Sequence, residues 1–211
     1  LTPGRVGNAH ALSCCPYNTP MERATSKPIT AFPPDQERVC GYPVRREVWT
    51  IRGRRFDLCW PADMDALLDD PETQRRNALD DYMPYWAQPW PGSILLAEAI
   101  LDGPPGKGRR AIELGAGIGI ASLAAAMMGW AVTTTDYDAD AITFAKLNAQ
   151  RTGVTLAGTA LLDYRDPPDQ TWPLVFGSDL LYERKKCEPI ARWLASGLHS
   201  EGTALLSDPN R

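Results

Sequence analysis

Glu113-Leu-Gly-Ala-Gly-Ile-Gly119 joins an apolar run at 111–114 to a helix-forming run at 120–128, and this junction decides the fold. Glycine allows a tight turn and lets a ligand lie against bare backbone. The dinucleotide pattern G-x-G-x-x-G is not met, because Ile120 replaces its third glycine when the pattern starts at Gly115. Asp136 ends the next apolar run, where a carboxylate can accept both hydroxyls of a ribose. The stretch therefore predicts a strand, a ligand-binding turn and a helix.

From Gly92 onward, short apolar runs alternate with amphipathic helical runs. This alternation is typical of a parallel sheet covered by helices. We expect an α/β fold with a doubly wound, mostly parallel, Rossmann-like sheet. The expected strands are 111–114, 131–135, 156–162, 174–180 and 203–206, and the expected helices are 93–101, 120–128, 139–151 and 189–198.

An acidic residue lies at the carboxyl end of every expected strand. Ligands of open α/β sheets bind beyond the carboxyl ends of the strands, so these acids should surround one crevice. They are Glu113, Asp136, Asp163, Asp179 and Asp208.

The chain divides into three parts. Residues 1–46 are rich in proline and show no periodicity, so we expect mostly irregular structure there. Residues 47–91 form an N-terminal extension, with a β-hairpin over 47–58 around Arg52-Gly53-Arg54 and a helix-permissive acidic stretch over 63–79. Residues 92–211 form the ligand-binding domain. The chain begins with Leu1, and Met21 is the candidate start.

Composition narrows the function classes. The chain has 211 residues, 44% of them hydrophobic, which suits one core-bearing domain. Its net charge of −4 has the wrong sign for a nucleic-acid partner. Five cysteines without a C-x-x-C pair and two histidines indicate neither a metal site nor a disulfide framework. We read no signal peptide and no membrane span, and we expect a cytoplasmic protein.

The glycine turn, with an acid before it and Asp136 after it, resembles the pattern of class I S-adenosylmethionine-dependent methyltransferases. Further segments resemble the methyltransferase family 16 group, which includes the lysine methyltransferases of the electron-transfer flavoprotein β subunit. These segments are Pro84-Tyr-Trp-Ala-Gln-Pro-Trp-Pro-Gly92, Leu161-Leu-Asp-Tyr164, Gly177-Ser-Asp-Leu-Leu-Tyr182, which carries a D-x-x-Y motif, and Asp208-Pro-Asn-Arg211. The resemblance covers roughly residues 80–211.

The resemblance implies S-adenosyl-L-methionine as cofactor and assigns residues to its parts. Trp90 would flank the cofactor, Gly115 to Gly117 would line its methionine part, and Asp136 would hold the ribose. Asp163 and Tyr164 would hold the adenine, although many relatives carry Trp at the second position. The full set implied to bind the cofactor is Trp90, Glu113, Gly115, Ala116, Gly117, Gly119, Asp136, Tyr137, Asp163, Tyr164 and Ser178.

The D-x-x-Y motif implies that Asp179 and Tyr182 are catalytic, with Asp179 orienting an acceptor amine and Tyr182 closing the pocket. The motif lacks the prolines used by amide and nucleobase N-methylases, which disfavours those substrates. The resemblance to the D-x-x-Y group, whose members mostly methylate lysine, implies a lysine of a protein substrate. The alternative is a purely structural role, in which Asp179 and Tyr182 end a strand and cap the next helix. Trp86 and Trp90 can equally be loop residues held in the core, and Lys185 and Lys186 are assigned no role.

Two other functions stay open: a small-molecule methyltransferase, and a catalytically silent binding module that keeps the cofactor fold. The glycine turn alone also fits a nucleotide site or a purely structural turn. Class I methyltransferases normally add an antiparallel strand pair after the fifth strand, so we expect the chain to be incomplete at its C-terminus.

Overall fold

A five-stranded sheet forms the centre of the computed structural model, which describes residues 37–208. Its strands lie in the order β6 (Gly158–Leu161), β5 (Ala131–Asp136), β4 (Arg110–Glu113), β7 (Trp172–Ser178) and β8 (Leu198–Ser207). Every neighbouring pair is parallel. The predicted doubly wound parallel sheet is confirmed, and the strand order reverses between β4 and β7, where such sheets bind ligands.

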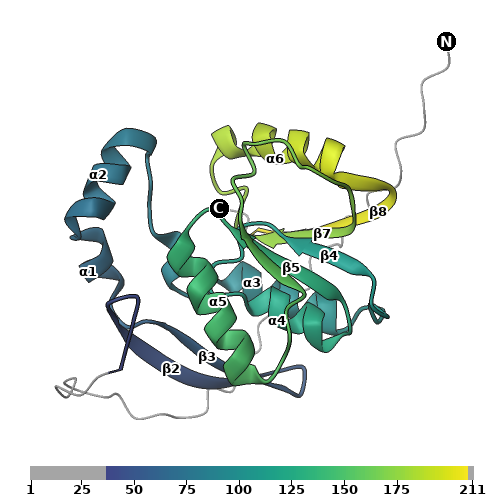
Figure 1. Ribbon diagram of the computed structural model, residues 1–211, viewed down its shortest axis with the longest axis horizontal. Helices are drawn as coiled ribbons and strands as arrows, with labels where there is room; N and C mark the ends of the chain where they lie inside the picture. The colour runs from purple at the N-terminus through teal and green to yellow at the C-terminus, as the bar shows by residue number, and fades with distance from the viewer. Residues whose placement is uncertain (1–36, 209–211) are drawn as a thin grey trace, which may run out of the picture. The chain divides into compact units, whose positions relative to one another are not determined.

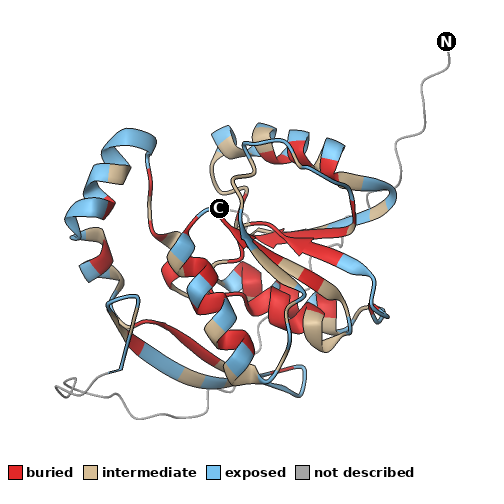
Figure 2. Cartoon of the chain, viewed as in Figure 1, coloured by how far each residue is buried: buried red, intermediate tan, exposed pale blue. Residues whose placement is uncertain are grey.

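Helices cover both faces of this sheet (Figure 1). The helix α6 (Arg184–Gly197) packs Ile190 and Trp193 against Ile112 and Val175 on one face. On the other face α3 (Pro91–Leu101), α4 (Ile120–Met127) and α5 (Ala139–Thr152) share one apolar core with residues of β4, β5 and β7. Figure 2 shows buried residues on the strands and on the inner sides of these helices. The central strands β4, β5 and β7 are therefore mostly buried, as expected for parallel strands covered on both faces.

A second sheet contains β1 (Arg38–Val39), β2 (Tyr42–Ile51) and β3 (Arg54–Pro61). The predicted hairpin is present, but β1 and β2 occupy residues that were expected to be irregular up to position 46, which corrects that boundary. The buried Asn148 of α5 ties the hairpin to the main sheet domain, because it accepts from Cys59 N and donates to Cys59 O and Ile118 O. The rest of the predicted irregular tail, with Met21, lies outside the described residues.

Several element limits differ from the prediction for identifiable reasons. The acidic stretch forms two helices, α1 (Met64–Leu68) and α2 (Pro71–Asp80), because Asp70 caps α2 and Pro71 begins it. The strand β7 ends at Ser178, since Asp179 adopts a left-handed φ of +53°. The helix α6 starts at Arg184 rather than at Pro189, which lies inside it and forgoes one backbone hydrogen bond.

No helix in the range 37–208 is both long and apolar enough to cross a bilayer.

Candidate active site

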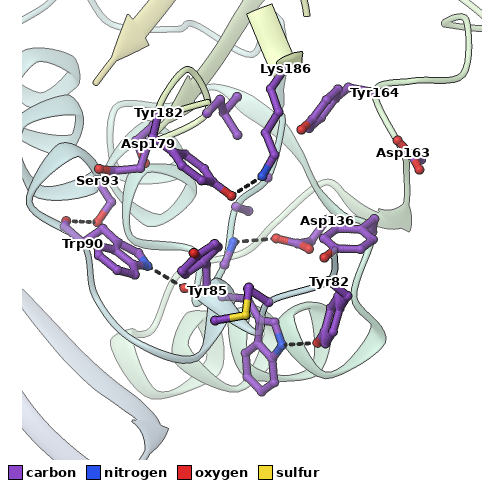
Figure 3. A pocket seen from close by; sticks show the side chains of 18 of the residues that line it. Tyr82, Tyr85, Trp90, Ser93, Asp136, Asp163, Tyr164, Asp179, Tyr182 and Lys186 are labelled. Carbon is purple, nitrogen blue, oxygen red and sulfur yellow. Dashed lines mark hydrogen bonds between the residues drawn. The ribbon is translucent and has the colours of Figure 1, made fainter. Parts of the chain in front are cut away.

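A cavity of about 450 Å³ lies at the carboxyl ends of β4, β5, β6 and β7 (Figure 3). Of the five acidic strand ends predicted to surround a crevice, Asp136, Asp163 and Asp179 line this cavity, whereas Glu113 and Asp208 do not. Its lining combines the loops after these strands with the segment 80–93 before and at the start of α3. Eleven of the thirteen predicted site residues line it: Trp90, Gly115, Ala116, Gly117, Asp136, Tyr137, Asp163, Tyr164, Ser178, Asp179 and Tyr182.

The glycine turn leaves bare backbone at the cavity. Gly115 and Gly117 have φ values of +60° and +54°, which L side chains rarely adopt. A Cβ on Gly115 would lie 2.6 Å from Leu180 Cδ2, so a side chain there would force Leu180 to move. The turn is anchored to the neighbouring strand, because Ala116 N donates to Thr135 O at 2.9 Å. The backbone therefore stays both exposed to a ligand and fixed.

Asp136 faces this turn from the end of β5. Its Oδ2 atom accepts from Gly117 N at 2.8 Å and its Oδ1 atom accepts from Asp138 N at 2.9 Å. Burial raises the pKa of Asp136 to about 6, although these backbone hydrogen bonds pull it down. A carboxylate has about four acceptor positions, so Asp136 keeps acceptor capacity for hydroxyl groups in the cavity.

Glu113 and Gly119 were predicted to bind the cofactor, but neither lines the cavity. Glu113 is 1% exposed, and its carboxyl group accepts a hydrogen bond from Ser122 Oγ beneath the turn. Burial raises the pKa of Glu113 to about 8, so the group is mostly protonated at neutral pH. Gly119 begins α4 with a φ of +87° and lies against Ala145. Both residues support the turn from behind.

A cluster of acidic and aromatic residues lies beside Tyr137, just after the end of β5. Some of its members were not singled out from the sequence. Tyr82 lies against Tyr137 with ring centroids 5.8 Å apart. Its hydroxyl donates to Asp138 Oδ2 at 2.5 Å and accepts from Trp86 Nε1 at 3.2 Å. Trp86 is 6% exposed and stacks near Phe144, so it is a core residue that also borders the cavity. The only sequence signal was the density of aromatics in 82–90.

Asp163 lines the cavity but is already engaged in a charge network. Arg165 Nε donates to Asp163 Oδ2 at 2.7 Å, and Arg165 Nη1 donates to both carboxylate oxygens of Asp80 at 2.9 Å. Burial alone would raise the pKa of Asp163, but Arg165 holds it below its usual range. The network joins the end of α2 to the loop after β6 across the cavity rim.

The loop after β7 is held from two sides. Asp179 N donates to Ser207 O at 2.7 Å, and Leu181 N donates to Asp208 Oδ2 at 2.6 Å. The Asp179 side chain lies beside Ser93 in the first turn of α3 (Figure 3), where a Cβ on Gly92 would collide with its carboxylate. Asp179 therefore does not cap α6, whose N-cap residue is Glu183.

An aromatic cluster closes this end of the cavity. Tyr85 makes edge contacts with Trp90 and Tyr182, with ring centroids 5.8 and 5.3 Å apart. Burial raises the pKa of Tyr182, so its hydroxyl stays protonated at neutral pH. Lys186 points into the cavity and donates to the Tyr182 hydroxyl (Figure 3). Neither Tyr85 nor Lys186 was predicted to belong to the site.

The residues present fit S-adenosylmethionine, the methyl donor implied by the sequence. Gly115 and Gly117 line the cavity where the methionine part would lie, and Asp136 has acceptor capacity for ribose hydroxyls. Tyr137 and Tyr164 offer aromatic faces for an adenine. These groups together match the parts of an adenosyl ligand lying along one side of the cavity.

Comparisons with known proteins agree with this geometry. The family model described as lysine methyltransferase matches residues 89–211, more than half of the chain. The chain is 29% identical over 131 residues to the electron transfer flavoprotein beta subunit lysine methyltransferase of Danio rerio, covering 61% of this chain and 51% of that protein. The protein of the same name from Xenopus laevis is 31% identical over 131 residues, covering 61% and 53%.

The chain spans about half the length of these curated relatives. Among solved structures, a T. thermophilus 16S rRNA methyltransferase in complex with AdoMet and guanosine has a TM-score of 0.55 at 18% identity, covering 77% of this chain and 41% of that one. At this identity the likeness shows the fold alone, which is that of a class I methyltransferase. The match over residues 89–211 shows that the chain belongs to the lysine methyltransferase family.

Proposed function

We propose that the protein transfers a methyl group from S-adenosylmethionine to the side-chain amine of a lysine in a protein substrate. The observation that carries this proposal is one continuous cavity with two chemically different ends. Asp136 and the bare glycine turn suit an adenosyl ligand at one end, and Tyr85, Trp90 and Tyr182 form an aromatic wall at the other. An alkylammonium side chain suits aromatic faces.

The cofactor supplies an already activated methyl group on a sulfonium when it is bound. The chain therefore has to align an acceptor nitrogen within about 3 to 3.5 Å of that carbon and exclude water. The fixed glycine turn and the anchored loop 178–182 provide two rigid walls for this alignment. No covalent intermediate with a protein side chain is needed.

A lysine amine must lose its proton before it attacks, because its reference pKa is near 10.4. An apolar, aromatic environment favours the neutral amine, whereas a carboxylate nearby favours the ammonium form. Asp179 lies against the first turn of α3, whose positive dipole end offsets part of its charge. Asp179 can then orient the amine without strongly retaining its proton, while Tyr182 confines it.

Protein rather than nucleic acid is the acceptor class that we propose. The net charge of −4 supports this choice, because nucleic-acid binders need a positive surface. The names of the curated relatives, which are lysine methyltransferases, support it as well. A cytoplasmic location stays a prediction from the sequence.

Labelled S-adenosylmethionine incubated with a cell lysate tests the function. We expect label in one or a few protein bands, at lysine residues. Asp179→Asn and Tyr182→Phe should each lower turnover at saturating cofactor, with S-adenosylhomocysteine affinity retained. Wild-type turnover in both variants would remove these residues from the mechanism. Label confined to small molecules would favour the small-molecule alternative, and absence of cofactor binding would favour a silent module.

A further inference from the structure

Two lysines among the described residues line the cavity, and they differ in what their amines contact. The Lys185 amine pairs with Asp81 at 2.8 Å on an exposed surface. The Lys186 side chain is only 25% exposed and reaches the aromatic end of the cavity. Its Nζ atom lies 4.0 Å from the ring centroid of Tyr182 and 6.0 Å from that of Tyr85.

These contacts hold a lysine side chain at the aromatic end of the cavity. An ammonium over tyrosine faces gains cation–π attraction, and a tyrosine hydroxyl orients it by a hydrogen bond. Lys186 makes both interactions, because its amine also donates to Tyr182 Oη. Glu183 Oε1 lies 3.2 Å from the same nitrogen, so the amine has a carboxylate at its outer side. The chain thus presents its own lysine to the aromatic wall.

An ammonium group at the position of Lys186 Nζ would oppose methylation of a second amine beside it. Methyl transfer moves positive charge from sulfur to the acceptor nitrogen, and a neighbouring ammonium raises the energy of that charge. A fixed cation is therefore a poor helper at this position. The conflict disappears when Lys186 itself is the acceptor.

We propose that Lys186 occupies the acceptor position between Tyr85 and Tyr182 and is N-methylated by its own chain. This inference rests on the proposed function. Lys186 Nζ first gives a proton to water, and its lone pair then forms the bond to the methyl carbon. The electron pair of the broken sulfur–carbon bond stays on sulfur, leaving S-adenosylhomocysteine. No other reactant is required.

The full chain incubated with S-adenosylmethionine alone, followed by peptide mass mapping, tests this step. We expect one added methyl group or more at Lys186, with a first-order rate that does not change with protein concentration. Lys186→Arg should abolish the modification, whereas Lys146→Arg, on the remote helix α5, should leave it unchanged. An unmodified Lys186, or a first-order rate constant that rises with protein concentration, would overturn the proposal.

A parallel incubation with a cell lysate distinguishes failure of the Lys186 inference from failure of the proposed function. Labelled lysate proteins with an unmodified Lys186 overturn only the present inference, whereas no labelled protein at all overturns the proposed function as well. Binding of n-butylammonium to the cofactor-free protein supplies a readout without catalysis. Lys186→Ala should bind it several-fold more tightly than Lys185→Ala, because the aromatic position is vacated. Equal affinities would show that Lys186 does not occupy that position.

Discussion

Asp136 Oδ2 and the backbone nitrogen of Gly117 are joined by a 2.8 Å hydrogen bond across the cavity wall. Asp136 ends strand β5 and Gly117 lies in the turn after β4, so this bond fixes the spacing between the Asp136 carboxylate and the bare turn. A ligand that needs both groups meets them already aligned. Pre-alignment reduces the ordering that binding would otherwise require.

Asp136→Asn should weaken binding of S-adenosylhomocysteine by about 10- to 100-fold, because charge-assisted hydrogen bonds to the ribose are lost. Titration calorimetry measures this loss. Asp169→Asn, at an exposed loop position, is the matched control and should bind like the wild type. Unchanged affinity in Asp136→Asn would contradict the assignment of this carboxylate to the ribose.

Cofactor affinity should fall as the pH drops below about 6. Burial raises the pKa of Asp136 to about 6, so acidification neutralises the carboxylate that we propose accepts the ribose hydroxyls. The decrease approaches about tenfold per pH unit if the protonated form does not bind. Calorimetry between mildly alkaline and mildly acidic pH follows it, and the decrease should be absent in Asp136→Asn.

Glu113 should make the folded state less stable as the pH rises. Its pKa is about 8 in the folded chain against an ordinary 4.5, so the folded state holds a proton that the unfolded state releases in this window. The stabilising contribution is complete below 4.5 and is lost as the pH rises through 8.

Glu113→Gln removes this titration while keeping the shape of the side chain. The melting temperature of the variant should therefore change less with pH than that of the wild type, as thermal unfolding can show. The exposed Glu188→Gln is the control. Parallel pH profiles for the wild type and Glu113→Gln would rule out a protonated Glu113.

Tyr82→Phe should lower the free energy of unfolding by about 1–3 kcal/mol. The substitution removes a donor to Asp138 and leaves the buried Trp86 Nε1 without its acceptor. Chemical denaturation measures the change. Tyr137→Phe, whose residue is 42% exposed, should cost much less, and equal costs would contradict the importance of this network.

Asp208→Ala should reduce turnover more than it reduces cofactor affinity. Asp208 holds Leu181 N and so fixes the loop that carries Asp179 and Tyr182. Misplacement of catalytic groups by a fraction of an ångström can cost about tenfold or more in rate. Asp208→Asn keeps an acceptor oxygen and should retain most activity. A loss in affinity with unchanged turnover would place Asp208 on the cofactor side instead.

Local sequence patterns were sufficient for the central sheet. The apolar runs around β4, β5 and β7 predicted parallel strands because such strands are buried on both faces. The glycine turn and Asp136 could be placed because their spacing follows from one strand-turn-helix unit. Pro189 misled the prediction of α6, since a proline near a helix start can also lie inside the helix.

Contacts between distant segments were not predictable. Glu113 ends a strand and was therefore expected to face the crevice. Its side chain instead turns beneath the glycine turn toward Ser122. Tyr82 and Tyr85 reach the cavity only because the segment before α3 folds back over the sheet edge. Lys186 reaches it because α6 begins one turn earlier than predicted. Each case depends on tertiary packing rather than on periodicity.

The segment 80–88 supplies one wall of the cavity, yet it lies ahead of the region 89–211 that defines the family. The range of the family match therefore does not contain the whole cavity lining. A chimera spliced at residue 89 would inherit the glycine turn but exchange Tyr82 and Tyr85 for foreign neighbours. A chimera meant to carry over the substrate preference of one relative would therefore have to include the segment 80–88 together with the sheet.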